Sequence, residues 1–218
     1  MKSQARGGTR WKRFAVVMVP SVGAAAAVTM AIAQGALAAS FSVSGQQFQV
    51  EAGEMKGENF VQYGSIDQNK EGGHPVVVVG LKHAKISNLC QSVSVRVPII
   101  NQDVSMKLRA GQGPNESDKV DAGNLYIDAD VLNANAEFEN IDIGVPVDNA
   151  PKGPGPGKGD HYVPGSFAQQ ADKVTFRDAK QRAWATTAGT FALKGLKMDI
   201  KFGKNECFDP KDLKKVDD

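Results

Sequence analysis

The feature that most constrains this chain is a two-residue alternation of apolar and polar side chains, repeated in short runs. Residues 41–50 (FSVSGQQFQV), 92–100 (SVSVRVPII) and 103–111 (DVSMKLRAG) all show it. Such alternation places apolar side chains on one face of a β-strand. No window of about a dozen residues shows the three- and four-residue apolar spacing of an amphipathic helix. The pattern therefore predicts an all-β protein.

Further strands are predicted at 74–81, 172–179 and 189–202. The run HPVVVVGL at 74–81 is almost continuously apolar, which is typical of a strand buried on both faces. Many short strands divided by Gly and Pro indicate an antiparallel-rich sandwich, an open barrel or a short β-solenoid. Residues 146–166 contain five Pro and five Gly and no strand-like run. We therefore expect a Gly/Pro-rich loop insertion there, within one domain.

The alternation changes phase in three places. Ala84 and Ile86 are two residues apart, but the next apolar residue, Leu89, comes three residues later. Similar three-residue steps follow Phe138 and Leu193. An extra residue that reverses the alternation is what a β-bulge inserts. Because Ile86, Phe138 and Leu193 are 52 and 55 positions apart, the three segments could form a repeat. The alternative is that they resemble one another only because all are strands.

The first 38 residues have the features of an export signal. A basic region with Arg10 and Arg13 precedes an uncharged apolar run at 14–34, and Ala36-Leu37-Ala38 provides the small-x-small pattern for cleavage before Ala39. The alternative is a retained membrane anchor, since the apolar run is about long enough to span a bilayer. The expected boundaries are a signal peptide or anchor at 1–38, one β domain at 39–207 and a polar tail at 208–218.

Removal of this segment changes the charge of the protein. All 24 acidic residues follow position 38, whereas five of the 26 basic residues precede it. Residues 39–218 therefore carry 21 basic and 24 acidic groups, a formal charge of −3. This balance argues against the basic surface that nucleic-acid binding requires.

Cys90 and Cys207 are the only cysteines. In an exported protein, an even pair is best interpreted as one disulfide. The bridge would close a loop of more than 100 residues, which contributes about 4–5 kcal/mol in the chain-entropy model. A zinc site or a nucleophilic cysteine is the less favoured alternative, because neither cysteine has a Cys or His nearby at ligand spacing.

Residues that could support hydrolysis are few. The chain contains no G-x-S-x-G motif, and the segments around Ser65 and Ser166 lack both the second Gly and a following helix. The three histidines are His74, His83 and His161. We expect them to be ordinary loop or strand-edge residues rather than general bases.

Residues 124–145 (NLYIDADVLNANAEFENIDIGV) hold five carboxylates: Asp128, Asp130, Glu137, Glu139 and Asp142. Asp128 and Asp130, with Asn133 and Asn135, suggest a calcium loop, but the Gly and Glu that an EF-hand requires are missing. In the strand register, all five carboxylates fall on the polar side. We therefore predict two solvated strand faces joined near 131–133, with a bulge at 139–140. No metal or cofactor is expected.

The segments NLYIDADVLNANAEFENIDIG (124–144) and GSFAQQADKVTFRDAKQRAWATTAGTFALKGLKM (165–198), after an Ala-rich N-terminal segment, resemble a family of secreted actinobacterial proteins of unknown function. G-S-F-x-Q-Q-A-D at 165–172 is the most recognisable motif. The resemblance covers nearly all of 39–218 and implies an exported cell-envelope protein. It also implies a candidate partner, a small multi-pass membrane protein encoded near the relatives. Some similar sequences carry an automatic cholesterol-esterase label, but the family supplies no catalytic motif.

These observations favour a non-catalytic, exported β domain of the cell envelope with a structural or ligand-binding role. Envelope lipid is the second candidate partner, and nucleic acid is not expected. One alternative is a lipid- or sterol-ester hydrolase that uses Ser65 or Ser166 with His74 or His161. Another is a lipid or sterol carrier, which would need an apolar cavity inside the fold.

Overall fold

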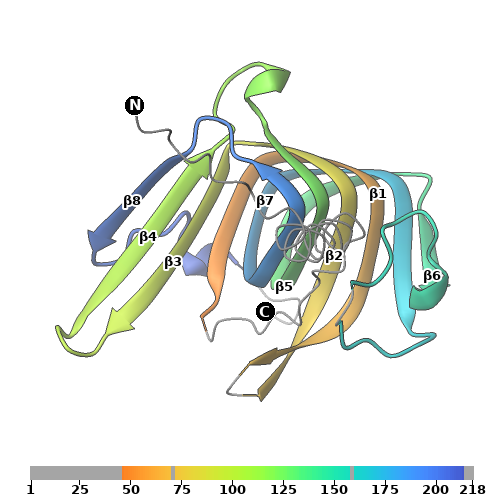
Figure 1. The fold of residues 1–218 in the computed structure, drawn as a ribbon, viewed down its shortest axis with the longest axis horizontal. Coiled ribbons are helices and arrows are strands. Elements are labelled where there is room, and N and C mark those ends of the chain that lie inside the picture. The colour runs from red at the N-terminus through yellow and green to blue at the C-terminus, as the bar shows by residue number, and fades with distance from the viewer. Residues whose placement is uncertain (1–45, 70–71, 158–159, 214–218) are drawn as a thin grey trace, which may run out of the picture. The chain divides into compact units, whose positions relative to one another are not determined.

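The computed structural model describes residues 46–69, 72–157 and 160–213. Its long elements are all β-strands of one antiparallel sheet, in the order β6-β7-β5-β2-β1-β3-β4-β8 (Figure 1). The prediction of an all-β, antiparallel fold is therefore confirmed. The predicted signal peptide and its cleavage site at Ala38 and Ala39 lie outside the described residues. Within the described ranges, no helix is long and apolar enough to cross a membrane.

Four long strands close into a ring, because β7 pairs with β1 as well as with β5. The ring strands are β1 (Phe48–Asn69), β2 (Gly72–Ser87), β5 (Val120–Glu139) and β7 (Phe167–Ala192). Its interior is a packed core that includes Phe60, Leu81 and Leu125, each almost completely buried. Phe60 also packs edge-on against Phe176, with ring centroids 6.3 Å apart. The apolar side chains of the predicted alternating strands thus fill the interior of this ring.

Three strands extend from the ring and form what we call the wing: β3 (Leu89–Val97), β4 (Gln102–Ala110) and β8 (Lys197–Phe202) (Figure 1). The wing joins the ring where Gln49–Glu51 of β1 pair with Cys90–Ser92 of β3. At the other end of the sheet, the short strand β6 (Asp142–Pro146) pairs with β7. The short 3-10 helices are η1 (Glu116–Asp118), η2 (Val147–Asn149) and η3 (Pro210–Asp212).

The three predicted changes of phase lie where strands are interrupted. Asn88 separates β2 from β3 and Asn140 separates β5 from β6, both with positive φ (52° and 53°), and Gly195 lies between β7 and β8. At Asn88 no extra residue is inserted, because Glu54 pairs with Ser87 and Glu51 with Cys90 at the same offset. In place of the expected bulge, the chain has one residue in the left-handed conformation, Asn88, and the pairing register with β1 does not change. Asparagine tolerates this conformation better than most residues.

The predicted pair of strands in 124–139 is instead one strand, β5, which runs unbroken from Val120 to Glu139. The expectation of a joint near 131–133 is wrong. Pairing with β7 is only locally irregular there, with shifts between Asp128 and Val131 and between Asn133 and Asn135. The strand continues through the expected joint because Val131–Asn133 pair with β7, beyond Ala129, where the pairing with β2 ends.

Candidate functional site

The Gly/Pro-rich segment 146–166, called the cover loop here, packs on the outer face of the ring. Val147 is almost completely buried in a cluster with Val61 and Val78. Gly153 lies so close that an added Cβ would be 2.3 Å from the Cβ of Val61. The loop therefore forms a second apolar layer. This explains why Val78–Leu81 are buried on both faces, as the sequence predicted for this strand.

Polar and aromatic groups gather beneath the cover loop. The Tyr63 hydroxyl donates to Asp160 Oδ2, which also accepts from the backbone N–H of Gly157 (2.8 Å). His74 lies opposite Asp67 in the β1–β2 pairing, and its ring stacks on Trp184 with centroids 4.0 Å apart. Asp67 Oδ2 and His74 Nε2 are both buried without a hydrogen-bond partner.

The electrostatics of this cluster are dominated by burial. Desolvation, with smaller contributions from the nearby carboxylates of Asp67 and Asp160, raises the pKa of Asp128 to about 7. Burial and Asp160 also raise the pKa of Asp67, whereas His74 and His161 act in the opposite direction. The prediction of a fully solvated face does not hold for Asp128, which is half-buried and desolvated near Asp160 of the cover loop.

The other four carboxylates of residues 124–145 face basic side chains. Their ion pairs are Asp130–Arg182 (2.7 Å), Glu137–Arg177 (3.1 Å), Glu139–Lys173 (3.0 Å) and Asp142–Lys152 (2.9 Å). The Asp130 carboxylate also accepts from Gln47. No group of three or more His, Cys, Asp or Glu among the described residues is arranged to hold a metal ion. The carboxylates of this segment therefore serve mainly as partners of cross-strand cations.

The candidate hydrolytic residues are not assembled into a nucleophile–base pair. Ser65 is buried on β1, and the backbone of His161 lies beside it, since Ile66 N donates to His161 O (3.2 Å). No hydrogen bond in the described part of the chain joins Ser65 or Ser166 to a histidine. His83 instead contacts Asp121 (3.1 Å) at the half-exposed surface of the ring. This arrangement lacks the contact that activates a serine.

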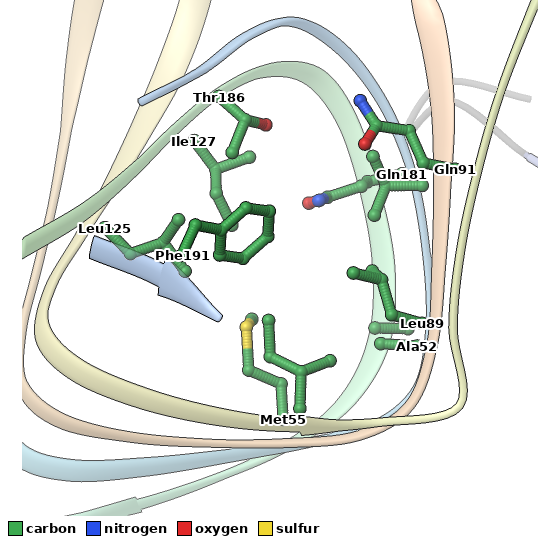
Figure 2. A pocket seen from close by; sticks show the side chains of 12 residues that line it. Ala52, Met55, Leu89, Gln91, Leu125, Ile127, Gln181, Thr186 and Phe191 are labelled. Atoms are coloured by element: carbon green, nitrogen blue, oxygen red, sulfur yellow. The ribbon is translucent and has the colours of Figure 1, made fainter. Parts of the chain in front are cut away.

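The mouth of the ring holds a small apolar cavity of about 30 Å³ (Figure 2). Phe191 extends across it, while Gln91, Gln181 and Thr186 line one side. A site for a drug-sized ligand occupies roughly 300–1,000 Å³. This cavity is therefore far smaller than an acyl chain or a sterol would need.

The polar face of the wing is covered by the C-terminal segment. Cys207 is joined to Cys90 of β3, with the sulfur atoms 2.03 Å apart. Ser92 Oγ accepts from Cys207 N (3.0 Å), and Ser105 Oγ donates to Gly203 O (2.6 Å). Phe208, in the predicted polar tail, is also buried. This segment thus stays packed past the disulfide.

The opposite face of the wing is apolar, and no described segment of the chain packs over it. Cross-strand pairs align its side chains in rows, with Val95 beside Val104 and Val104 beside Phe202 in one of them. Phe202 is 74% exposed and Ile200 is 68% exposed, whereas Ser92 and Ser105 on the polar face are almost completely buried. The apolar face, as defined here, comprises Val93, Val95, Val97, Val104, Met106, Leu108, Met198, Ile200 and Phe202. Within the described residues, the wing is thus covered on its polar side and uncovered on its apolar side.

Residues 44–208 match a family of unknown function (DUF6230). The chain belongs to this family. No curated protein and no solved structure matches the chain. The DUF6230 match runs from just before β1 to just after Cys207, so ring, wing and disulfide all lie within the domain that defines the family.

A polar groove of about 430 Å³ also lies in this DUF6230 domain, where the wing leaves the ring. Glu51 and Asp178 line it together with Arg109 and Lys180. The two acids balance the two bases, so the groove has no preference for either sign of charge. The bare apolar face is therefore the more informative candidate site. Its alternating residues were visible in the sequence, but nothing in the sequence indicated that the face is uncovered.

Proposed function

We propose that this protein is an exported docking protein of the cell envelope, with no catalytic role. The ring serves as a rigid support, and the apolar face of the wing contacts the partner. One observation carries the proposal: the sheet of the wing buries Ser92 and Ser105 but exposes large apolar side chains on its other face, namely Val95, Met106, Met198, Ile200 and Phe202. Contiguous exposed apolar surface of this kind marks interaction sites in folded proteins.

Export is supported by the N-terminal sequence and by the cysteine pair. The basic region, apolar run and Ala36–Ala38 pattern are those of a signal peptide. Disulfides persist in oxidising compartments outside the cytosol, and Cys90 lies at bonding distance from Cys207. Both partners expected from the family resemblance, a small multi-pass membrane protein and envelope lipid, offer apolar surface to the wing.

Site-specific photo-cross-linking in intact cells tests the docking role. A photoreactive residue at Ile200, on the apolar face, should form an adduct with an envelope component. The matched control is Ile143 in β6, which is equally exposed (67%) but lies at the far end of the sheet. Adducts at neither position, or equal yields at both, would contradict the proposal. Intact mass of the exported protein tests cleavage, with Ala39 as the expected first residue.

A further inference from the structure

We infer that the partner of the apolar face is the surface of an anionic lipid bilayer, an inference that rests on the docking function proposed above. The nine side chains of this face form an apolar surface that no charged residue interrupts, and polar side chains on the same face occur only at its two ends, with Gln91 opposite Leu108 and Gln102 opposite Val97. Lipid hydrocarbon offers no hydrogen-bond partners, so a continuous apolar surface can enter it without leaving a polar side chain unsatisfied. Because β8 is exposed along its whole length, this surface reaches the edge of the sheet.

The distribution of charge favours an anionic surface. The wing and its flanking turns, residues 89–110 and 193–206, contain seven Lys or Arg and three Asp or Glu, a formal charge of +4. Since residues 39–218 carry −3, the rest of that segment carries −7. An anionic bilayer would attract the wing and repel the remainder, which orients the protein with the wing toward the lipid. The basic side chains of the strands lie on the covered face and at the margins, from which long Lys side chains can reach lipid head groups.

The turn between β3 and β4 provides a point of insertion. Ile99 is 96% exposed, and Ile100 beside it is 47% exposed. The turn is held by a hydrogen bond from Asn101 N to Pro98 O (3.2 Å), and Arg96 also donates to the Asn101 side chain (2.7 Å). Two isoleucines are therefore presented at the end of the apolar face by an ordered turn, next to an arginine that suits the interfacial region.

A second copy of the chain is a weaker candidate for the same surface. Two wings packed through their apolar faces would form a pair in which each wing carries +4, with basic side chains around its margins and no complementary charge on the partner. Like charges at an interface oppose association, whereas an anionic bilayer supplies the complementary charge. The same positive charge that disfavours the dimer thus favours the lipid surface.

Vesicle sedimentation with the exported protein tests the inference. We expect binding to vesicles of phosphatidylglycerol and phosphatidylcholine in equal parts, and at least tenfold weaker binding to phosphatidylcholine alone. The double variant Ile200→Thr/Phe202→Thr, which keeps strand-favouring residues, should bind at least tenfold more weakly. Its control is Ile143→Thr/Phe167→Thr, an exposed Ile and Phe pair (67% and 62%) at the opposite end of the sheet, which should bind like the parent.

Charge variants distinguish electrostatic attraction to anionic lipid from non-specific adsorption to vesicles. Each Lys near an anionic surface strengthens binding about fivefold, so Lys197→Gln/Lys204→Gln should weaken it roughly 25-fold. Lys82→Gln/Lys211→Gln, outside the wing, should change binding less than twofold. Equal effects of the wing and control variants would overturn the inference. So would a dimer in sedimentation equilibrium that becomes monomeric in the Ile200→Thr/Phe202→Thr variant. Cross-links from position 200 to a protein, with no vesicle binding, would reject the lipid partner and leave the docking role standing.

Discussion

Asp128 is a carboxyl group on the outer face of β5, beneath the cover loop and near the carboxyl groups of Asp67 and Asp160. Burial raises its pKa from 3.8 to about 7. An acid with a higher pKa in the folded than in the unfolded state stabilises the fold while protonated. That contribution is complete below about pH 4 and is lost as the pH rises to about 7. At about 1.4 kcal/mol per pKa unit, it amounts to no more than about 4 kcal/mol.

Asp128→Asn should therefore remove this pH dependence. Denaturant unfolding at pH 4.5 and pH 8 should show that the parent loses free energy of unfolding, relative to the variant, as the pH rises. Asp142→Asn is the control with opposite sign, because hydrogen bonds from Lys152 and Gln170 lower the pKa of Asp142. The contribution of Asp142 is lost only as the pH falls below about 4, so this variant is compared with the parent at pH 3 as well as at pH 4.5. The same trend in both variants would contradict the assignment of a buried, raised-pKa carboxyl to Asp128.

At the scale of the strand, left-handed residues set where the alternation changes phase. Asn124 has φ of 49° within β5, although pairing with β2 keeps one offset on either side of it. Asn124→Gly should leave the free energy of unfolding nearly unchanged, because glycine adopts positive φ without strain. Asn124→Val should lower it by about 1–2 kcal/mol. The comparison is Asn135→Val on the same strand, where φ is not positive. An equal loss at position 135 would assign the effect to the side chain instead.

The sequence predicted strands well but not their partners. Period-two alternation identified most strands and the three changes of phase, since both depend only on neighbouring residues. It missed that the change at Asn88 is shared across the sheet. Gly53 of β1 falls opposite Asn88 in one pairing and opposite Asp178 in another, so three strands change phase together and the register survives. Only the pairing of distant segments reveals this.

At the scale of the whole domain, the apolar face shows the same limit of prediction from sequence. Val104, Met106 and Leu108 identify one face of β4 as apolar from the sequence alone. Alternation cannot say whether an apolar face is covered, because that depends on which segment packs against it. Here the cover loop shields the polar-looking face that carries Asp128, while the C-terminal segment covers the serine face of the wing. Exposure was therefore the property that the sequence could not supply.

The wing and the ring should differ in stability once the disulfide is removed. Among the described strands, the wing pairs with the ring through Gln49–Glu51 alone, whereas β1 pairs with β7 from Phe48 to Tyr63. Cys90–Cys207 also holds the covering segment, and closing a loop of this length contributes about 4–5 kcal/mol. In Cys90→Ala/Cys207→Ala, hydrogen exchange should accelerate in β4 and β8 well before β5 and β7, because local opening frees the wing first. Equal acceleration in all four strands would show instead that ring and wing unfold as one cooperative unit.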